Sequence, residues 1–133
     1  MKIGRREAIR MGGAVAAAFA GLAAPFAQEG QMYGLIGKMT ATAGSRDALI
    51  EILLDGVAGM PGCLSYVVAR DPADADAIWI TEVWDSKDSH QASLSIPAVK
   101  QAIAKGRPLI AGMGERIVTM PAGGHGLVKS KIG

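Results

Sequence analysis

Apolar and polar residues alternate along several stretches of this chain, and alternation with a period of two is typical of half-buried strands. In the first stretch Tyr33, Leu35 and Met39 share one face, while Ile36 and Thr40 lie on the other. The pattern predicts four strands, at residues 33–42, 63–70, 77–84 and 115–120. A short polar segment joins the second strand to the third, so these two form a hairpin.

Between the strands, apolar residues recur every three or four positions, which predicts amphipathic helices. Ser45 is a plausible N-cap for the first helix, which ends near Gly59 because Pro61 cannot continue it. Its apolar face comprises Leu49, Ile52, Leu53, Val57 and Met60.

A second helical region follows the third strand and is interrupted in its middle. Its first part is capped by Asp85 or Ser86 and ends at about Leu94. Pro97 suits the first position of the second part, which Pro108 ends. The residues expected to face inward there are Val99, Ala102, Ile103 and Gly106.

The predicted order is β-α-β-β-α-β, which is the ferredoxin-like α+β unit with an antiparallel four-stranded sheet and its helices on one face. The other face of such a sheet is left bare. Leu, Val, Ile and Met side chains on it would form a patch too large for a soluble monomer. We therefore expect a second copy to cover this face in a homodimer.

The first 27 residues have the order of an export signal. Residues 1–10 are basic, 11–24 are uncharged, and small residues follow. Arg5 and Arg6, followed by Ala8, Ile9 and Arg10, resemble the twin-arginine signal. We expect the twin-arginine machinery to export the protein to the periplasm or beyond, with removal of residues 1–27. Fourteen uncharged residues are too few for a stable membrane anchor.

The charge and the composition limit the classes of partner and cofactor that are expected. The net charge is +2 and the first ten residues carry +3, so the rest of the chain is near −1 and nucleic acid is not expected. One cysteine, two histidines and a glycine pattern at 112–114 that lacks a third glycine predict neither a metal site nor a dinucleotide cofactor. Cys63 lies in an apolar strand, where it is either buried or available to pair between chains.

The third strand and the helix after it carry the candidate chemistry. Alternation places Glu82 and Trp84 on the same face, and His90 follows six residues later in the first helical turns. With Ser93, these side chains can line one cavity. The alternatives are a structural His90, a core Trp84, and a Glu82 at the rim paired with Arg70 or Arg116.

The pattern Glu82-Val83-Trp84 with His90 resembles the antibiotic biosynthesis monooxygenase family, including its quinol monooxygenase members. Pro61-Gly62-Cys63-Leu64-Ser65-Tyr66 is similar to the family's entry into the second strand, and the resemblance spans about residues 32–120. It implies a dimeric α+β barrel that oxidises quinols, anthrones and related aromatic compounds with O₂, without flavin, haem or metal.

This resemblance makes His90, Glu82 and Trp84 the candidate catalytic residues, with the neutral imidazole of His90 as the base that takes the substrate proton. Tyr66 and Trp84 would form walls of the substrate pocket, together with Ser93 and either Met39 or Met113.

Two other functions stay open at this point. One is a non-catalytic barrel that binds a small hydrophobic ligand, as in a stress response. The other is a haem-degrading monooxygenase, although the chain lacks the asparagine of that group's pattern. The expected domain covers residues 32–121, and residues 122–133 form a flexible Gly-rich tail that contains His125.

Overall fold

The computed structural model describes residues 30–127. The predicted signal peptide, with Arg5 and Arg6, lies outside these residues, as does the end of the predicted tail. Within the described part of the chain, no helix has the length and apolar character needed to span a membrane.

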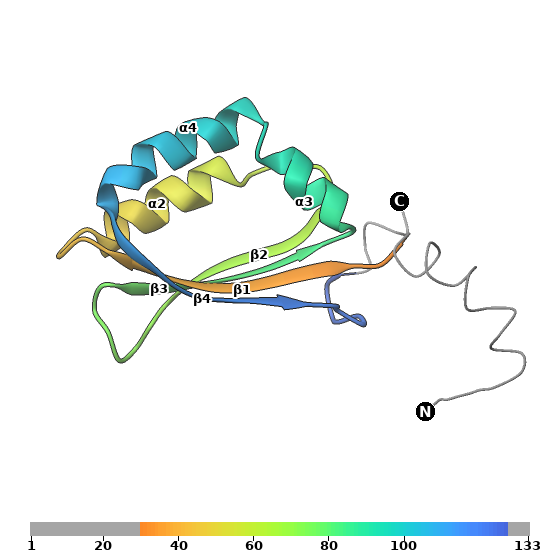
Figure 1. Cartoon of the computed structure of the whole chain (residues 1–133), viewed down its shortest axis with the longest axis horizontal. Coiled ribbons are helices and arrows are strands. Elements are labelled where there is room, and N and C mark those ends of the chain that lie inside the picture. Colours follow the sequence, from red (N-terminus) through yellow and green to blue (C-terminus); the bar gives the residue numbers. More distant parts are fainter. Residues whose placement is uncertain (1–29, 128–133) are drawn as a thin grey trace, which may run out of the picture. The chain divides into compact units, whose positions relative to one another are not determined.

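Four antiparallel strands form one sheet in the order β2-β3-β1-β4, and the helices lie on one of its faces (Figure 1). The strands are β1 (Tyr33–Ala41), β2 (Cys63–Arg70), β3 (Ala77–Trp84) and β4 (Ile110–Thr119). The helices are α2 (Arg46–Gly56), α3 (Lys87–Ser93) and α4 (Pro97–Gly106), followed by the 3₁₀ turn η2 (Arg107–Leu109). The predicted ferredoxin-like α+β unit is confirmed.

β4 differs from its prediction, because it begins at Ile110 and not at Glu115. Its added residues pair with β1: Met113 lies opposite Met39, and Gly112 lies opposite Thr40. The pairing is irregular there, with shifts of register on both sides of these two pairs. Backbone hydrogen bonds to β1 extend the strand through Gly112 and Gly114, although glycine has a low strand propensity.

The first helix is shorter than predicted, since α2 ends at Gly56. The chain reverses soon afterwards through Gly59 and Gly62, whose φ values of 75° and 82° lie in the left-handed region that glycine tolerates best. Ser45 makes no side-chain cap hydrogen bond to the helix. Its hydroxyl oxygen instead accepts a hydrogen bond of 2.8 Å from Thr42 Oγ1.

The core fills the space between the sheet and α2. Leu49 and Ile50 of α2 pack with Ala41 of β1 and with Ile78 and Ile80 of β3, and all five are buried. Ile50 is missing from the predicted apolar face of this helix, because the helix buries a wider stripe than a strict three- and four-residue spacing indicates.

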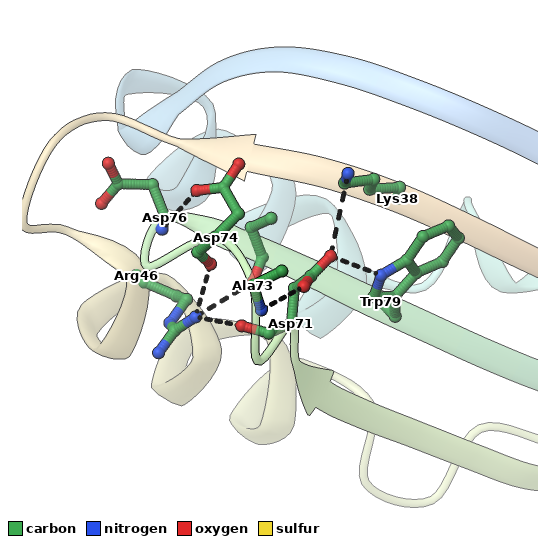
Figure 2. Close-up of polar contacts among 8 residues, drawn as sticks. Lys38, Arg46, Asp71, Ala73, Asp74, Asp76 and Trp79 are labelled. Carbon is green, nitrogen blue, oxygen red and sulfur yellow. Dashed lines mark hydrogen bonds and ion pairs between the residues drawn. The ribbon is translucent and has the colours of Figure 1, made fainter.

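One polar network fixes the hairpin loop between β2 and β3 (Figure 2). Arg46 Nη1 donates hydrogen bonds to the carbonyls of Asp71 and Asp74, at 3.2 and 2.9 Å. The Asp71 carboxylate accepts from the Ala73 amide and from Trp79 Nε1, and it lies 3.7 Å from Lys38 Nζ. These donors lower the pKa of Asp71, the Ala73 amide most. The network holds the end of the hairpin far along β3 from Trp84.

The helix-free face of the sheet carries apolar side chains. Ile36 lies opposite Thr81 on one side and Ile117 on the other, and Val67 is also opposite Thr81, so these residues share that face. Val67 and Ile117 are about half exposed, at 52% and 49%. This is the face that the sequence predicts a second copy to cover, and the homodimer stays a prediction.

Candidate active site

Three strands and a short helix bring the site residues together beneath the helices. Glu82 of β3 lies between Leu35 of β1 and Tyr66 of β2 in the sheet. The helix that carries His90, α3, begins after a connection of two residues from β3, and Ser86 caps it by accepting a hydrogen bond of 3.0 Å from the Ser89 amide. Because this connection is short, His90 lies over the end of β3, next to Trp84.

Glu82 lies between two nitrogen-bearing rings. Trp84 Nε1 donates a hydrogen bond of 2.9 Å to Glu82 Oε1, and His90 Nε2 lies 4.0 Å from the same oxygen. The His90 ring contacts Trp84 edge-on and Tyr33 at a tilt, with 5.4 Å between ring centroids in each case. The side chains of His90 and Glu82 are only 14% and 17% exposed.

The surroundings of His90 favour its neutral imidazole. Burial lowers its pKa from the ordinary value, Glu82 opposes this shift, and the positive charge of Arg116 adds to it. The Nδ1 atom is buried and has no hydrogen-bond partner among residues 30–127. The Ser93 hydroxyl donates a hydrogen bond of 2.6 Å to the backbone carbonyl of His90 and so ties the two turns of α3 together.

A cavity of about 220 Å³ lies between the sheet and the helices at this point. Six of the residues singled out in the sequence line it: Met39, Tyr66, Glu82, Trp84, His90 and Ser93. The rest of the lining is almost entirely apolar and includes Leu53, Val57, Met60, Ile80, Leu94, Val99, Ala102 and Ile103. Burial raises the pKa of the Tyr66 phenol far above its ordinary value, with smaller contributions from Glu82 and Cys63, so the phenol stays a neutral donor.

Met113 does not line this cavity. It lies on β4, beyond the strands that the helices cover, and is 71% exposed. It lines a second hollow of about 150 Å³ with Arg116, and this hollow shares Met39, Ile80 and Glu82 with the first. Glu82 is therefore on the boundary between the two hollows.

Sequence reasoning missed several residues of the site. The sequence pattern places Tyr33 on a strand face but not beside His90, because this contact joins β1 to α3 and so has no local signal. For the cavity residues of α2 and α4, the spacing predicts only helix faces that pack a core. Spacing identifies such a face, but it does not show whether the face meets another side chain or an open space.

The structure also tests the alternative, non-catalytic interpretations of Glu82 and Trp84 and the expected burial of Cys63. Arg70 pairs with Asp47, with 3.0 Å between Nε and Oδ1, and so is not the partner of Glu82. Trp84 is 1% exposed, so it belongs to the core and lines the cavity as well. Cys63 is half-buried, and burial raises the pKa of its thiol. Across the described part of the chain, no three His, Cys, Asp or Glu side chains are grouped to hold a metal ion.

Residues 32–105 match the profile of the antibiotic biosynthesis monooxygenase family. The chain belongs to this family. A protein of Chloroflexus aurantiacus, named as a candidate antibiotic biosynthesis monooxygenase, is 70% identical over 72% of this chain and 98% of its own length, with a TM-score of 0.71. No curated protein sequence matches at a significant level.

More distant solved structures share the fold. A candidate member from Caulobacter crescentus is 20% identical over 74% of this chain and 94% of its own, with a TM-score of 0.60. SnoaB of Streptomyces nogalater, a cofactor-independent oxygenase solved as a point mutant, is 14% identical over 71% of this chain and 96% of its own, with a TM-score of 0.59.

Proposed function

We propose that this protein is a cofactor-independent monooxygenase that oxidises a small quinol-like aromatic compound with O₂. The observation that carries the proposal is the apolar cavity with its polar groups concentrated around Glu82 and His90. An apolar cavity with few convergent polar groups is the usual form of a small-molecule site. Family membership supports an oxygenase, and the fold is shared with SnoaB, which is named a cofactor-independent oxygenase.

The size of the cavity favours a single aromatic ring. An engineered apolar cavity of about 150 Å³ holds benzene, and the cavity beside His90 measures about 220 Å³. That volume accommodates one ring with its hydroxyl groups and leaves room for O₂. A three-ring anthrone needs considerably more space, so a monocyclic quinol is the better substrate.

The reaction needs no added reductant. A base takes a hydroxyl proton, and the quinolate gives one electron to O₂. The two radicals then combine through a new C–O bond to form a peroxide anion, which the proton taken by the base converts into a hydroperoxide. Its O–O bond breaks, so that one oxygen stays on the ring as a hydroxyquinone and the other leaves as water with two substrate hydrogens. All electrons that reduce O₂ come from the substrate, and the apolar lining of the cavity disfavours water beside the radical pair.

Oxygen uptake tests this function. The purified chain is given monocyclic quinols and anthrones in the presence of a chelator, with buffer and heat-denatured protein as controls for autoxidation. We expect saturable uptake of one O₂ per quinol and one atom of ¹⁸O in the hydroxyquinone when ¹⁸O₂ is supplied. Formation of a plain quinone with H₂O₂ contradicts a monooxygenase. Saturable binding without uptake supports the ligand-binding alternative.

The proposal includes export by the twin-arginine route, which rests on Arg5 and Arg6 before a short apolar stretch. Replacement of both residues by lysine keeps the charge and removes the twin-arginine pair. We expect the R5K/R6K precursor to stay in the cytoplasm, whereas the unaltered chain reaches the periplasm in a shortened form. Normal processing of R5K/R6K contradicts this route.

A further inference from the structure

Glu82 and His90 differ in their ability to take a proton, and this difference follows from the surroundings of the His90 ring. We propose that Glu82 is the base that takes the hydroxyl proton of the substrate, and that neutral His90 donates a hydrogen bond from Nε2 to the same oxygen. This division of roles rests on the proposed function. It reverses the expectation from the sequence, in which His90 is the base.

The position of the imidazole proton follows from the burial of Nδ1. A neutral imidazole has one protonated nitrogen, which donates, and one unprotonated nitrogen, which accepts. Nδ1 of His90 is buried with no hydrogen-bond partner in residues 30–127. A buried N–H without an acceptor is rarer and costlier than an acceptor without a donor. The proton therefore belongs on Nε2, which has the carboxylate of Glu82 only 4.0 Å away.

This tautomer makes His90 a poor base. Its Nε2 already carries a proton, so a second proton would have to go to Nδ1, where no acceptor receives it. The groups that act on the ring are Glu82 of β3, Arg116 of β4 and the Tyr33 phenol of β1. Only Glu82 favours an imidazolium, while burial and Arg116 oppose it.

The separation of Glu82 and His90 suits a shared substrate oxygen. The distance of 4.0 Å between Nε2 and Oε1 is too long for a direct hydrogen bond. A hydroxyl oxygen can lie about 2.8 Å from both atoms, within ordinary hydrogen-bond length. Both residues line the cavity in which that oxygen would be bound.

The proton transfer is then simple. The substrate O–H bond breaks, a new O–H bond forms on the Glu82 carboxylate, and the negative charge moves to the substrate oxygen beside the His90 Nε2–H. No electron leaves or enters the pair in this step. The proton held by Glu82 passes to the peroxide anion, and the freed carboxylate then takes the proton from the oxygenated ring carbon and gives it to the hydroxide that departs when the O–O bond breaks. Trp84 Nε1, at 2.9 Å, keeps Glu82 in position throughout.

Two substitutions separate the roles. Glu82→Gln keeps an oxygen that accepts from Trp84 but cannot take a proton, and we expect turnover of a monocyclic quinol to fall about 10²- to 10⁴-fold. His90→Gln keeps an N–H donor of similar reach, and we expect a loss of less than about tenfold. The reverse order of effects, or a Glu82→Gln variant with wild-type turnover, overturns the proposal and leaves the proposed function intact.

Nitrogen NMR of the histidine rings gives a measurement that needs no turnover. The chain has two histidines, so a His125→Gln variant assigns the His90 signals. We expect a protonated Nε2 and a bare Nδ1 at about pH 7, near the ordinary titration range of histidine. A proton on Nδ1 overturns the proposal, even if Glu82→Gln fails to fold. If the wild-type chain oxidises no quinol, the proposed function fails together with the base role of Glu82, whereas the NMR result still decides the donor role of His90.

Discussion

Trp84 donates a hydrogen bond of 2.9 Å from its indole nitrogen to the carboxylate of Glu82, two residues earlier on the same strand. Residues two apart on a strand project from the same face, so the bond forms within β3 without help from another element. Because Trp84 is 1% exposed, it gives the carboxylate a fixed position at the cavity wall.

Replacement of Trp84 by phenylalanine should therefore weaken the fold and the site together. The variant loses ring volume in the core and leaves a buried carboxylate without its donor. We expect the free energy of unfolding to fall by about 2–3 kcal/mol, as measured in urea. The Michaelis constant for a quinol should rise, because the cavity loses a wall and its carboxylate is less constrained.

Trp79→Phe is the matched control for this prediction. Trp79 also donates from Nε1 to a carboxylate at 2.9 Å, that of Asp71, but it lies on the helix-free face next to Lys38. We expect a smaller loss of stability and no change in the Michaelis constant. Equal effects of the two substitutions on quinol oxidation would mean that the Trp84 bond has no special role at the site.

The burial of His90 predicts a dependence of stability on pH. Its pKa is lowered in the folded chain from an ordinary value of about 6.5. Below that pH the unfolded chain binds a proton that the folded chain does not, so the free energy of unfolding falls as the pH decreases. Above it both states are neutral and this contribution vanishes.

Urea titrations between about pH 5 and pH 8, which bracket the ordinary histidine pKa, measure this effect. We expect His90→Gln to flatten the decline below about pH 6.5, whereas His125→Gln should not, because His125 is exposed after β4. A wild-type chain whose stability rises as the pH falls through this range would show that His90 gains a proton on folding.

The strands of the hairpin could be predicted to the residue, because alternation and the polar turn at 71–76 are local features. The start of β4 could not, since it depends on pairing with β1 across a sequence distance of about 70 residues. Long-range pairing overrides the low strand propensity of Gly112 and Gly114.

The association of Glu82, Trp84 and His90 could also be anticipated, because one strand and the next helix carry all three. The tautomer of His90 could not, since it depends on which ring nitrogen the fold buries. Nor could the exclusion of Met113 from the cavity, which follows from the place of β4 at the sheet edge, beyond the cover of the helices.

The crossing of α2 and α4 beside the cavity gives a third prediction. A Cβ at Gly56 would overlap the side chain of Ala102, while one at Gly112 would meet nothing within 4 Å. Alanine improves helix propensity by about 1 kcal/mol, but overpacking costs about 1–3 kcal/mol. We expect Gly56→Ala to lower the melting temperature and Gly112→Ala to leave it nearly unchanged. A stabilised Gly56→Ala variant would show that the helices separate freely at this crossing.

The helix-free face of the sheet gives the last prediction, which concerns the homodimer. Obligate interfaces bury on the order of 2,000 Å² or more, and a charge placed at the centre of such a face has no partner when it is desolvated. Val67 lies on this face and is 52% exposed, while Leu54 lies on α2 and is 50% exposed. The two residues are thus a matched pair of exposed aliphatic side chains on opposite sides of the sheet.

We expect Val67→Glu to convert a dimer into a monomer at micromolar concentration, and Leu54→Glu to leave the dimer intact. Light scattering gives the mass of each variant, and circular dichroism checks that both fold. A wild-type chain that is a stable monomer, or a Val67→Glu variant that remains dimeric, would contradict assembly through this face. Dissociation caused by Leu54→Glu alone would place the interface on the helical side, where a partner would cover α2 and leave the apolar strands bare.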